Sequence, residues 1–514
     1  MFQEDRIGLR LKVTLLLLGL AALMIRLWGL TRQSLWIDEV FSVKYAGLGE
    51  SMSWAKLQVN LQGPLHAFLL FLWTRLFGWS ELSVRLPQAI ISACTVPLLY
   101  LVARKDFGER VALAGAIALA INPFHVWYAQ EVRNYAFVVF CTVLAIRASR
   151  TLEEKGGRAS VAKLAGSWTA GLLCNMSFAF HAIAVVVHGL LVFRRRKAFL
   201  LGVAAAAATT IVLLLPWEIG FYQRRVESSY LLRLQAVPQS ALLRGETTAP
   251  ILGIPYAAYT FAAGFSLGPS LRELHDLPAK EALSRHLFAV ASVALVFGTL
   301  GVSGVLRWVR GDERRRFWLV CLVVPIVFGY LIALRNVKAF NPRYLSVALP
   351  AFVMLIADGA DSLRPRALGV AAASAAVVLC ATSLIQLATL PVYWKEDTRA
   401  ATRILRAEMR PGDLVVAVGT LEPITRFYWL DLFGNKSYGR YILNRDNNPD
   451  DPAEQKRTLD AIHAARRTFV VFYREGYNDP DGKWEAFIRS HFPVAQTWEP
   501  LGIRIWRLGS ENGP

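Results

Sequence analysis

Ser34-Leu35-Trp36-Ile37-Asp38-Glu39 directly follows the first long apolar run, at residues 12–30, and carries two adjacent carboxylates. An apolar run of about 20 residues is long enough to cross a bilayer as a helix. The acidic pair is therefore expected at a membrane surface, on the opposite side from the N-terminus. The other unusual polar clusters can be placed on that same side, so this stretch indicates both the fold class and the face that carries a site.

The composition is that of a membrane protein. Of the 514 residues, 54% are hydrophobic and only 18% are charged, which is unusual for soluble domains and typical of polytopic membrane proteins. The formal net charge of +19 does not indicate nucleic-acid binding, because the basic residues cluster in short loops between apolar runs. The five cysteines lie inside apolar runs, so we interpret them as packing residues rather than as disulfides or metal ligands.

About eleven segments are apolar enough to be membrane spans, counted by the length that a bilayer requires. No small-residue cleavage site follows the first one, so we expect it to be retained rather than removed as a signal peptide. The segments are residues 12–30, 86–103, 111–128, 134–149, 162–178, 180–193, 199–216, 286–306, 317–334, 345–360 and 367–390.

Lysine and arginine give the orientation. With about eleven spans, the basic clusters all fall on one side, which the positive-inside rule identifies as cytoplasmic. They are found at residues 6–12, 104–110, 147–163, 194–197 and 307–316. The N-terminus is then cytoplasmic, and the opposite side receives residues 31–85, 128–135, 217–285, 335–344 and 391–514. The apolar segment 64–78 is too short for a full span and is expected to lie at the interface.

The last part of the chain has the sequence pattern of a soluble domain. A helical pattern at 398–410 alternates with short apolar strands at Asp413–Val418, Thr468–Tyr473 and Gly502–Leu508, and turn signals separate them. We predict a membrane domain at 1–390, with outer loops 31–85 and 217–285, and a periplasmic α/β domain at 391–514. The fold class is thus a polytopic α-helical membrane protein with a C-terminal soluble α/β domain.

Asp38 is the first candidate for chemistry. A carboxylate near the membrane surface can act as a general base on a hydroxyl group. Glu39 is adjacent, but neighbouring side chains in an extended loop point in different directions, so only one of the pair is expected to reach a given substrate. The alternative is a solvated acidic pair, although the flanking Trp36 and Phe41 favour a packed loop.

The remaining candidates lie in two outer turns. Glu131 and Arg133 occupy a very short turn between two spans, where charges are costly unless they are paired or used; a structural ion pair is the alternative. The turn 335–344 concentrates Arg335, Lys338 and Arg343 on the side where positive charge is normally depleted. An anionic partner such as a phosphate would explain this, and arginine has the matching fork geometry. Anchoring to anionic lipid headgroups is the alternative.

Other polar residues of the spans and outer loops point less clearly to chemistry. Arg26, near the outer end of the first span, is expected to snorkel outward. No pair of histidines has metal-ligand spacing, so no metal or other cofactor is predicted. A divalent ion stays possible, although an aspartate-x-aspartate pair is missing from the first outer loop.

Together these parts match an inverting glycosyl transfer from a lipid-linked phosphate sugar. A carboxylate takes the proton of the acceptor hydroxyl, and fixed positive charge stabilises the departing phosphate. Because nucleotide sugars are cytoplasmic, a site on the outer side has to use a donor that is carried by a membrane lipid.

The sequence resembles the GT-C superfamily of integral-membrane glycosyltransferases, and within it the family of protein O-mannosyltransferases and the lipid A aminoarabinose transferase. The resemblance rests on SLWIDEVFS at 34–42, QGPLHAFLLFLWTRLFGWSELSVRLPQAI at 62–90, NPFHVWYAQEVRNYAF at 122–137 and FNPRYLSVALP at 340–350. It covers most of the membrane portion and only the general character of the tail. Where many relatives carry His-Pro-Pro, this chain has Gln62-Gly63-Pro64, so the role of that histidine is not carried over, and His66 is no safe substitute.

This resemblance implies the GT-C fold, a polyprenyl- or dolichyl-phosphate sugar donor and a set of site residues. Asp38 corresponds to the acidic residue of the family's first outer loop, which is taken as catalytic. Glu131 and Arg133 correspond to the acid and arginine of the second, and Arg343 with Tyr344 to a late Arg-Tyr pair.

We therefore expect a glycosyltransferase of the bacterial inner membrane that moves a sugar from a polyprenyl-phosphate carrier to a lipid, glycan or protein acceptor on the periplasmic side. Asp38 is the expected base, with Glu39 or Glu131 orienting the acceptor. Arg133, Lys338, Arg343 and Tyr344 are expected to bind the donor phosphate in a pocket shared with Asp38. The loop 217–285, with Tyr256, Tyr259 and Phe261, is expected to cover the lipid-facing groove.

Two other classes are considered. A lipid-linked glycan flippase requires a polar path through the spans, whose segments are mostly without ionisable groups. A non-catalytic assembly subunit requires binding of the lipid carrier without turnover. The sugar, the acceptor and the oligomeric state are not determined by the sequence.

Overall fold

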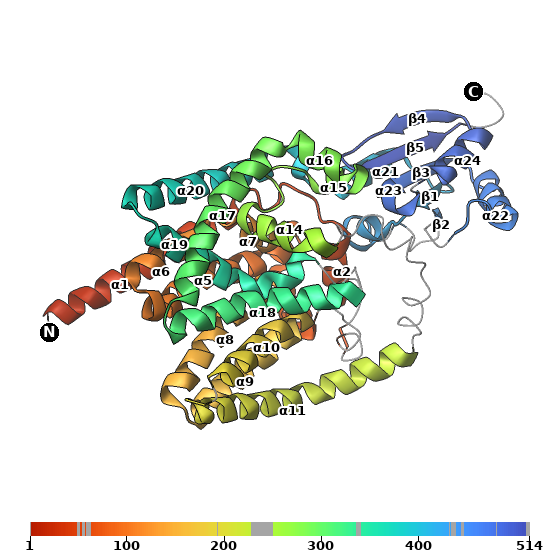
Figure 1. Ribbon diagram of the computed structural model, residues 1–514. Coiled ribbons are helices and arrows are strands. Elements are labelled where there is room, and N and C mark those ends of the chain that lie inside the picture. Colours follow the sequence, from red (N-terminus) through yellow and green to blue (C-terminus); the bar gives the residue numbers. More distant parts are fainter. Residues whose placement is uncertain are drawn as a thin grey trace. The chain divides into compact units, whose positions relative to one another are not determined.

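A computed structural model describes residues 2–48, 52–53, 57, 63–192, 194–227, 250–335, 341–430, 432, 438–443, 447–479 and 481–509. The chain divides into two compact units. Unit 1 comprises residues 1–30 and 52–393, and unit 2 comprises residues 31–51 and 394–514. Figure 1 shows the elements of both units.

Unit 1 is helical in its described part. Among the described residues, eight of its helices are long and apolar enough to cross a membrane, and a bent pair of helices could form a ninth span. Its main helices are α1 (Phe2–Leu27), α4 (Pro64–Phe77), α5 (Glu81–Phe107), α6 (Glu109–Ala120), α7 (Pro123–Ala129), α8 (Tyr135–Lys155), α9 (Arg158–Cys174), α10 (Ala179–Leu191), α11 (Lys197–Glu227), α14 (Pro250–Ala263), α15 (Leu271–Asp276), α16 (Ala279–Arg285), α17 (Leu287–Val309), α18 (Glu313–Arg335), α19 (Leu349–Ser362) and α20 (Arg366–Thr389). Short 3₁₀ helices are η1 (Met176–Phe178), η3 (Pro342–Ala348) and η4 (Pro391–Tyr393). The prediction of a polytopic helical protein is confirmed.

Every one of the eleven expected spans corresponds to helix, but three of them differ from a simple span. The segment 111–128 is the bent pair α6 and α7, whose axes differ by 52°; Asn122 caps α7 and Pro123 begins it, and proline cannot continue the preceding helix. The segments 162–178 and 180–193 form the shorter helices α9 and α10. Asn175 separates these two, in an extended conformation.

The expected outer loop 217–285 is largely helical in its described part; residues 228–249 lie outside the described residues, so the covering role given to the segment stays a prediction. Helix α11 continues to Glu227, and α14 packs into the interior of unit 1. Phe261 is buried and lies edge-on to Phe124 and to Phe352, at 4.9 and 5.6 Å between ring centroids. Tyr259 donates a hydrogen bond to the carbonyl of Leu267. These contacts fix the end of α14 in the apolar core instead of leaving it as a loop over a groove.

Small residues bring helices close together in unit 1. A Cβ atom at Gly359 of α19 would lie 2.0 Å from the carbonyl oxygen of Leu300 in α17. At Gly304 of α17 it would lie 2.4 Å from the carbonyl oxygen of Leu355 in α19. Membrane helices associate through this kind of close backbone packing, because lipid provides no hydrophobic driving force between them.

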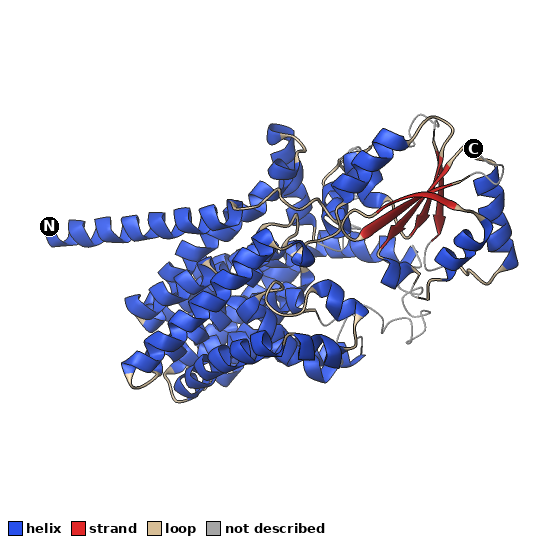
Figure 2. Ribbon diagram, turned by 90° about the horizontal axis from the view of Figure 1, so that it is seen from above, coloured by secondary structure: helices blue, strands red, loops and turns tan. Residues whose placement is uncertain are grey.

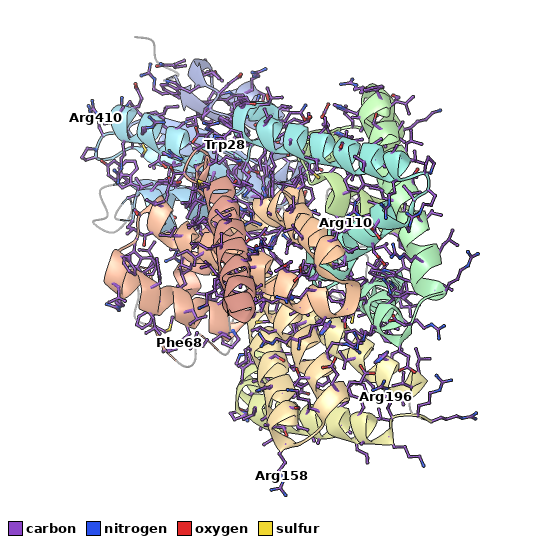
Figure 3. All side chains as sticks on the ribbon, turned by 90° about the vertical axis from the view of Figure 1, so that its left-hand side faces the viewer. Trp28, Phe68, Arg110, Arg158, Arg196 and Arg410 are labelled. Carbon is purple, nitrogen blue, oxygen red and sulfur yellow. The ribbon has the colours of Figure 1, made fainter. Side chains whose placement is uncertain are left out.

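The basic connections between helices lie at one end of unit 1. Arg196, before α11, pairs with Glu313 of α18 at 3.1 Å, and Arg314 donates to the carbonyl of Lys105 at the end of α5 at 2.7 Å. In Figure 3 Arg158, at the start of α9, points outward from this end. Connections that the charge pattern assigns to one side of the membrane are thus joined by direct contacts.

Unit 2 contains a five-stranded sheet, which Figure 2 shows in red. The strands are β1 (Leu414–Val418), β2 (Gly439–Leu443), β3 (Thr468–Tyr473), β4 (Val494–Trp498) and β5 (Ile503–Leu508), in the order β2-β1-β3-β5-β4. Strand β1 pairs in parallel with β2 and β3, and β5 is antiparallel to β3 and β4. The other elements are α2 (Ile37–Tyr45), α21 (Thr398–Glu408), η5 (Ile424–Tyr428), α22 (Pro452–His463), α23 (Glu475–Asn478) and α24 (Lys483–His491).

Both faces of the sheet are covered, because side chains alternate along a strand. Val415 and Ala417 of β1 pack with Leu405 of α21 on one face. Val416 of β1 packs with α22 and α24 on the other, through Ile462 and Ile488 respectively. The predicted α/β character of the tail is confirmed, and the expected strands near β1, β3 and β5 are found. Strands β2 and β4 were not predicted, because they are half-exposed and lack a strong apolar pattern.

Candidate functional site

The segment 31–48 is fixed to the C-terminal domain within unit 2. Ser34 donates its hydroxyl hydrogen to the carbonyl of Glu396 at 2.9 Å. Thr398 donates to the carbonyl of Leu35 at 2.7 Å, and the hydroxyl of Tyr428 accepts a hydrogen bond from the Leu35 amide at 2.7 Å. These bonds define the backbone just before α2. The domain that follows the last span therefore positions the acidic stretch that follows the first one.

Trp36 continues this attachment. The guanidinium of Arg474 lies 5.2 Å from the centre of its ring, and the ammonium of Lys395 lies 5.3 Å from it, distances at which a cation is attracted to an aromatic face. Arg474 also donates to Glu396 at 2.8 Å. Burial alone would lower the pKa of Arg474, but the carboxylates of Glu396 and Asp38 raise it. Arg474 is therefore a fixed positive charge beside Asp38.

Asp38 and Glu39 both lie in the first turn of α2, where the helix dipole stabilises negative charge, but their surroundings differ. Glu39 is fully buried and accepts a hydrogen bond from the Trp36 amide at 3.3 Å. Asp38 is half-buried, and its charge acts on Arg474 and on the Tyr473 hydroxyl. The burial of Glu39 and its bond to the backbone favour a structural role for it, whereas the side chain of Asp38 is partly exposed.

In unit 1, Glu131 and Arg133 lie in the turn between α7 and α8, and both are buried. Arg133 lies over the ring of Tyr135, with 5.7 Å between the guanidinium carbon and the ring centre, and it is also a side-chain hydrogen-bond partner of Tyr135. The charge of Glu131 acts on the hydroxyl of Tyr128. The rings of Tyr128 and Tyr135 meet edge to face at 4.9 Å. A pair of tyrosines thus links the two charged residues.

Arg343 joins the same cluster from a distant part of the sequence. It lies in η3, which packs against α8, and its guanidinium lies 5.3 Å from the ring centre of Tyr344. The charges of Arg343 and Arg133 both act on the hydroxyl of Tyr135, and that of Arg343 also acts on Tyr128. The structure therefore brings Glu131, Arg133, Arg343 and Tyr344 together. We call them, with Tyr128 and Tyr135, the arginine–tyrosine cluster.

His66 is a neighbour of this cluster. Its Nε2 atom lies 2.8 Å from the side-chain amide of Gln88, and burial together with the charge of Arg133 lowers its pKa to about 3. It is therefore neutral at physiological pH. The preceding Gly63 has a φ of +89°, and a Cβ atom there would lie 2.2 Å from the carbonyl oxygen of Cys174. Proline cannot adopt this φ, which gives a physical reason for the glycine where many relatives have proline.

Three other expectations concern residues outside this cluster. Lys338 lies outside the described residues. Arg26 does not snorkel: it is fully buried and donates to the carbonyls of Ala120 and Leu119, at 2.8 and 3.3 Å, near the end of α6. A helix C-terminus carries partial negative charge, so this end of α6 satisfies Arg26 inside the protein. Within the described ranges, no three His, Cys, Asp or Glu side chains come together in a way that could hold a metal ion.

The structure assigns Glu131, Arg133, Arg343 and Tyr344 to unit 1, and Asp38 with Glu39 to unit 2. A pocket shared between Asp38 and the arginines stays a prediction. Sequence reasoning did not identify Arg474, Tyr128 or Tyr135. Tyr128 and Tyr135 are adjacent to the charged turn, so their positions were a usable signal, whereas Arg474 is 436 positions from Asp38 and carried none.

Comparison with known proteins supports the fold. Residues 62–219 match the family of dolichyl-phosphate-mannose-protein mannosyltransferases. The structure of ArnT from Cupriavidus metallidurans bound to undecaprenyl phosphate is similar, with a TM-score of 0.59 and 13% identity over 97% of this chain and 99% of that one. No curated protein sequence matches the chain.

Two further solved structures are similar. The oligosaccharyltransferase of Archaeoglobus fulgidus gives a TM-score of 0.51 and 12% identity, over 93% of this chain and 71% of that one. The mycobacterial arabinofuranosyltransferase AftD gives a TM-score of 0.50 and 14% identity, over 97% of this chain and 40% of that one. The expected resemblance is confirmed: the protein has the fold of the GT-C membrane glycosyltransferases, and residues 62–219 carry the sequence pattern of the dolichyl-phosphate-mannose-protein mannosyltransferase family.

Proposed function

We propose that this protein is an inverting glycosyltransferase that moves a sugar from a polyprenyl-phosphate carrier to an acceptor hydroxyl on the periplasmic side of a bacterial inner membrane. The observation that carries the proposal is the arginine–tyrosine cluster. Arg133 and Arg343, from distant parts of the sequence, both act on Tyr135 at the start of α8, and Arg343 also acts on Tyr128 of α7. Two positive charges so close together suit a phosphate, because arginine binds its oxygens through two parallel hydrogen bonds.

The similar ArnT structure is bound to undecaprenyl phosphate, which supports a lipid phosphate as the donor's leaving group. The distribution of basic residues supports the proposed orientation in the membrane. The connections rich in lysine and arginine lie at one end of unit 1, and by the positive-inside rule that end faces the cytoplasm.

In the proposed reaction Asp38 accepts the proton of the acceptor hydroxyl as that oxygen attacks the anomeric carbon. The bond between the anomeric carbon and the phosphate oxygen breaks, and its electron pair leaves with the phosphate. Arg133 and Arg343 stabilise the negative charge that develops there, and Tyr135 and Tyr344 hold the arginine side chains in place through the contacts described above. Attack from the opposite side of the leaving group inverts the configuration. Arg474 places a fixed positive charge beside Asp38.

The test uses the full chain in lipid nanodiscs, with undecaprenyl-phosphate sugars as donors and a bacterial envelope lipid and glycan extract as the acceptor source. Mass spectrometry follows both the release of undecaprenyl phosphate and the mass of the glycosylated product. We expect release and product in equal amounts. Binding of the lipid without release across the donor panel would favour a non-catalytic subunit. Movement of an intact donor across the bilayer, without cleavage, would favour a flippase.

A further inference from the structure

The α/β domain of unit 2 contains a cavity that the proposed reaction has not used. Its volume is about 360 Å³, at the lower end of the range for small-molecule sites (about 300–1,000 Å³). Its lining comes from Ile37, from residues that follow β1 and β3, and from β2. Ile37 is the first residue of α2 and precedes Asp38 directly.

The cavity lies where the topology of the sheet favours a ligand. Strand β1 pairs in parallel with β2 on one side and β3 on the other, so the strand order reverses at the β1–β3 pair. Ligands of open α/β sheets bind outside the carboxyl ends of the strands at such a reversal. Gly419 and Thr420 directly follow β1, and Arg474 directly follows β3.

The backbone at this edge has features that packing alone does not require. Gly419 has a φ of +120°, and a Cβ atom there would lie 2.5 Å from the carbonyl oxygen of Tyr473. Arg474 has a φ of +53°, the only positive value for a non-glycine residue in the described part of the chain. Such a strained conformation is concentrated at functional sites. At Arg474 this conformation occurs in the residue that follows β3 and lines the cavity.

The polar groups of the cavity offer both donors and acceptors. Thr420 accepts a hydrogen bond from the Glu422 amide at 3.1 Å and keeps its hydroxyl hydrogen. Thr425 donates to the carbonyl of Leu421 at 3.0 Å and keeps its lone pairs. The side-chain amide of Asn478 donates to the Tyr473 carbonyl at 2.8 Å, which leaves its oxygen as an acceptor. Such a mixed set matches a ligand whose groups both donate and accept, as sugar hydroxyls do.

The charges argue against a polyanion. Arg474 is balanced by Glu396 at 2.8 Å, and Glu422 by Arg426 at 3.0 Å. Arg440 adds one further positive charge to the lining. On β2, Arg440 and Ile442 are two residues apart and therefore share a face, and Ile442 is 42% exposed. An exposed aliphatic side chain beside hydroxyl and amide groups suits the apolar face of a sugar ring.

We propose that this cavity binds a sugar residue of the acceptor, which makes the acceptor a glycan. The inference rests on the proposed function, because Ile37 on the cavity wall places the bound sugar next to the base, Asp38. The C-terminal domain then has two roles, to position the segment that carries Asp38 and to present the acceptor to it. A polypeptide acceptor would instead require a groove for an extended backbone.

The experiment is saturation-transfer NMR on the full chain in nanodiscs, with methyl glycosides of glucose, galactose, mannose and N-acetylglucosamine as probes. Ile442→Trp fills the cavity from an exposed position. Thr425→Val removes one hydroxyl with little change in volume. Arg457→Gln is the control, since Arg457 lies on α22 with 59% of its side chain exposed. We expect a signal from at least one glycoside, a loss of at least tenfold with Ile442→Trp, a loss of about threefold with Thr425→Val, and none with the control.

Equal signals in all variants, or no glycoside signal in the wild type, would overturn the proposal. Displacement of the glycoside by millimolar inorganic phosphate would identify an anion site and also overturn the proposal. Displacement by a tripeptide would overturn it as well. Donor turnover by the wild-type chain separates the two proposals. A wild type that binds the glycoside but turns over no donor would leave the cavity in place and remove the transferase. If Ile442→Trp transferred sugar from the donor to a glycan with an unchanged acceptor KM, the transferase would stand and the cavity would not be the acceptor site.

Discussion

Unit 1 and unit 2 hold their charged residues in different ways. In unit 1, Arg133 lies over the ring of Tyr135 at the start of α8, and Arg343 lies over the ring of Tyr344 in η3. In unit 2, Asp38 is half-buried beside Arg474, in a helix that hydrogen bonds hold to the C-terminal domain. The difference matches a division of labour, in which one unit stabilises a leaving anion and the other removes a proton. Substitutions in the two units should therefore change different kinetic constants.

The largest effect is expected from Asp38→Asn, which removes the base but keeps the shape of the side chain. Loss of a general base lowers kcat by about 100- to 10,000-fold, whereas the donor KM should change little because the arginines proposed to bind the phosphate are in unit 1. Steady-state release of undecaprenyl phosphate measures both constants. A kcat within threefold of the wild type would exclude Asp38 as the base.

Arg26→Met tests the stability of unit 1 rather than its chemistry. Arg26 donates to Ser92 at 2.8 Å and to carbonyls near the end of α6, and hydrogen bonds to a charged group each contribute about 1.5–3 kcal/mol. We expect a loss of about 3 kcal/mol in the free energy of unfolding, seen as a lower Tm in detergent. Arg110→Met, at an exposed arginine, is the control and should leave the Tm unchanged.

Arg343→Lys keeps the charge but loses the planar fork and the stacking on Tyr344. The donor KM should rise about tenfold, corresponding to about 1.4 kcal/mol, with a smaller change in kcat. Arg110→Gln provides a matched arginine outside the cluster. If kcat fell as far as in Asp38→Asn while the donor KM stayed constant, the division between the two units would be wrong.

Thr398→Val removes the hydroxyl that holds the segment before α2, with little change in volume. One neutral hydrogen bond contributes about 1 kcal/mol, so we expect a kcat lowered by about fivefold or less and an unchanged pH profile, because the base itself is intact. Thr402→Val is the control, since that hydroxyl donates only within its own helix, to the Thr398 carbonyl at 2.7 Å. An equal effect of both variants would show that the loss reflects α21 and not Asp38.

Glu39→Gln should have the smallest effect. Glutamine can still accept the hydrogen bond from the Trp36 amide, so kcat and the donor KM should stay within about twofold of the wild type, given that such a bond contributes about 1 kcal/mol at most. The measurement is the same release assay, run beside Asp38→Asn. A loss of kcat comparable to that of Asp38→Asn would assign the base to the wrong member of the pair.

Much of the fold could be predicted because the signals are local. Long apolar runs identify helices of unit 1, and the short continuous apolar runs of β1 and β3 identify the centre of the sheet. The bend at Asn122-Pro123 and the short helices α9 and α10 were less visible, since hydropathy alone does not register a break within an apolar stretch. Helix α14 was read as loop because it follows a polar segment and is too short for a span.

The candidate site was predictable in part. Glu131 and Arg133 were identified because charge is costly in a short turn next to membrane spans, and Arg343 because positive charge is normally depleted on the outer side. Their common partners Tyr128 and Tyr135 are aromatic residues of ordinary type at a membrane surface, so composition did not distinguish them. The burial of Arg26 could not be foreseen, because the carbonyls that accept its hydrogen bonds belong to a helix about 95 positions away and leave no mark in the sequence.

The amino-acid sequence by itself determined that this is a polytopic membrane protein with an α/β tail, and which turns carry charge, because hydropathy and charge act over a few neighbouring residues. Only the tertiary structure decided which of these residues are partners. It grouped Arg343 with Arg133 around two tyrosines, and it attached the acidic helix α2 to a domain more than 340 positions later. Such pairings depend on how distant segments pack against one another, a property of the folded chain as a whole.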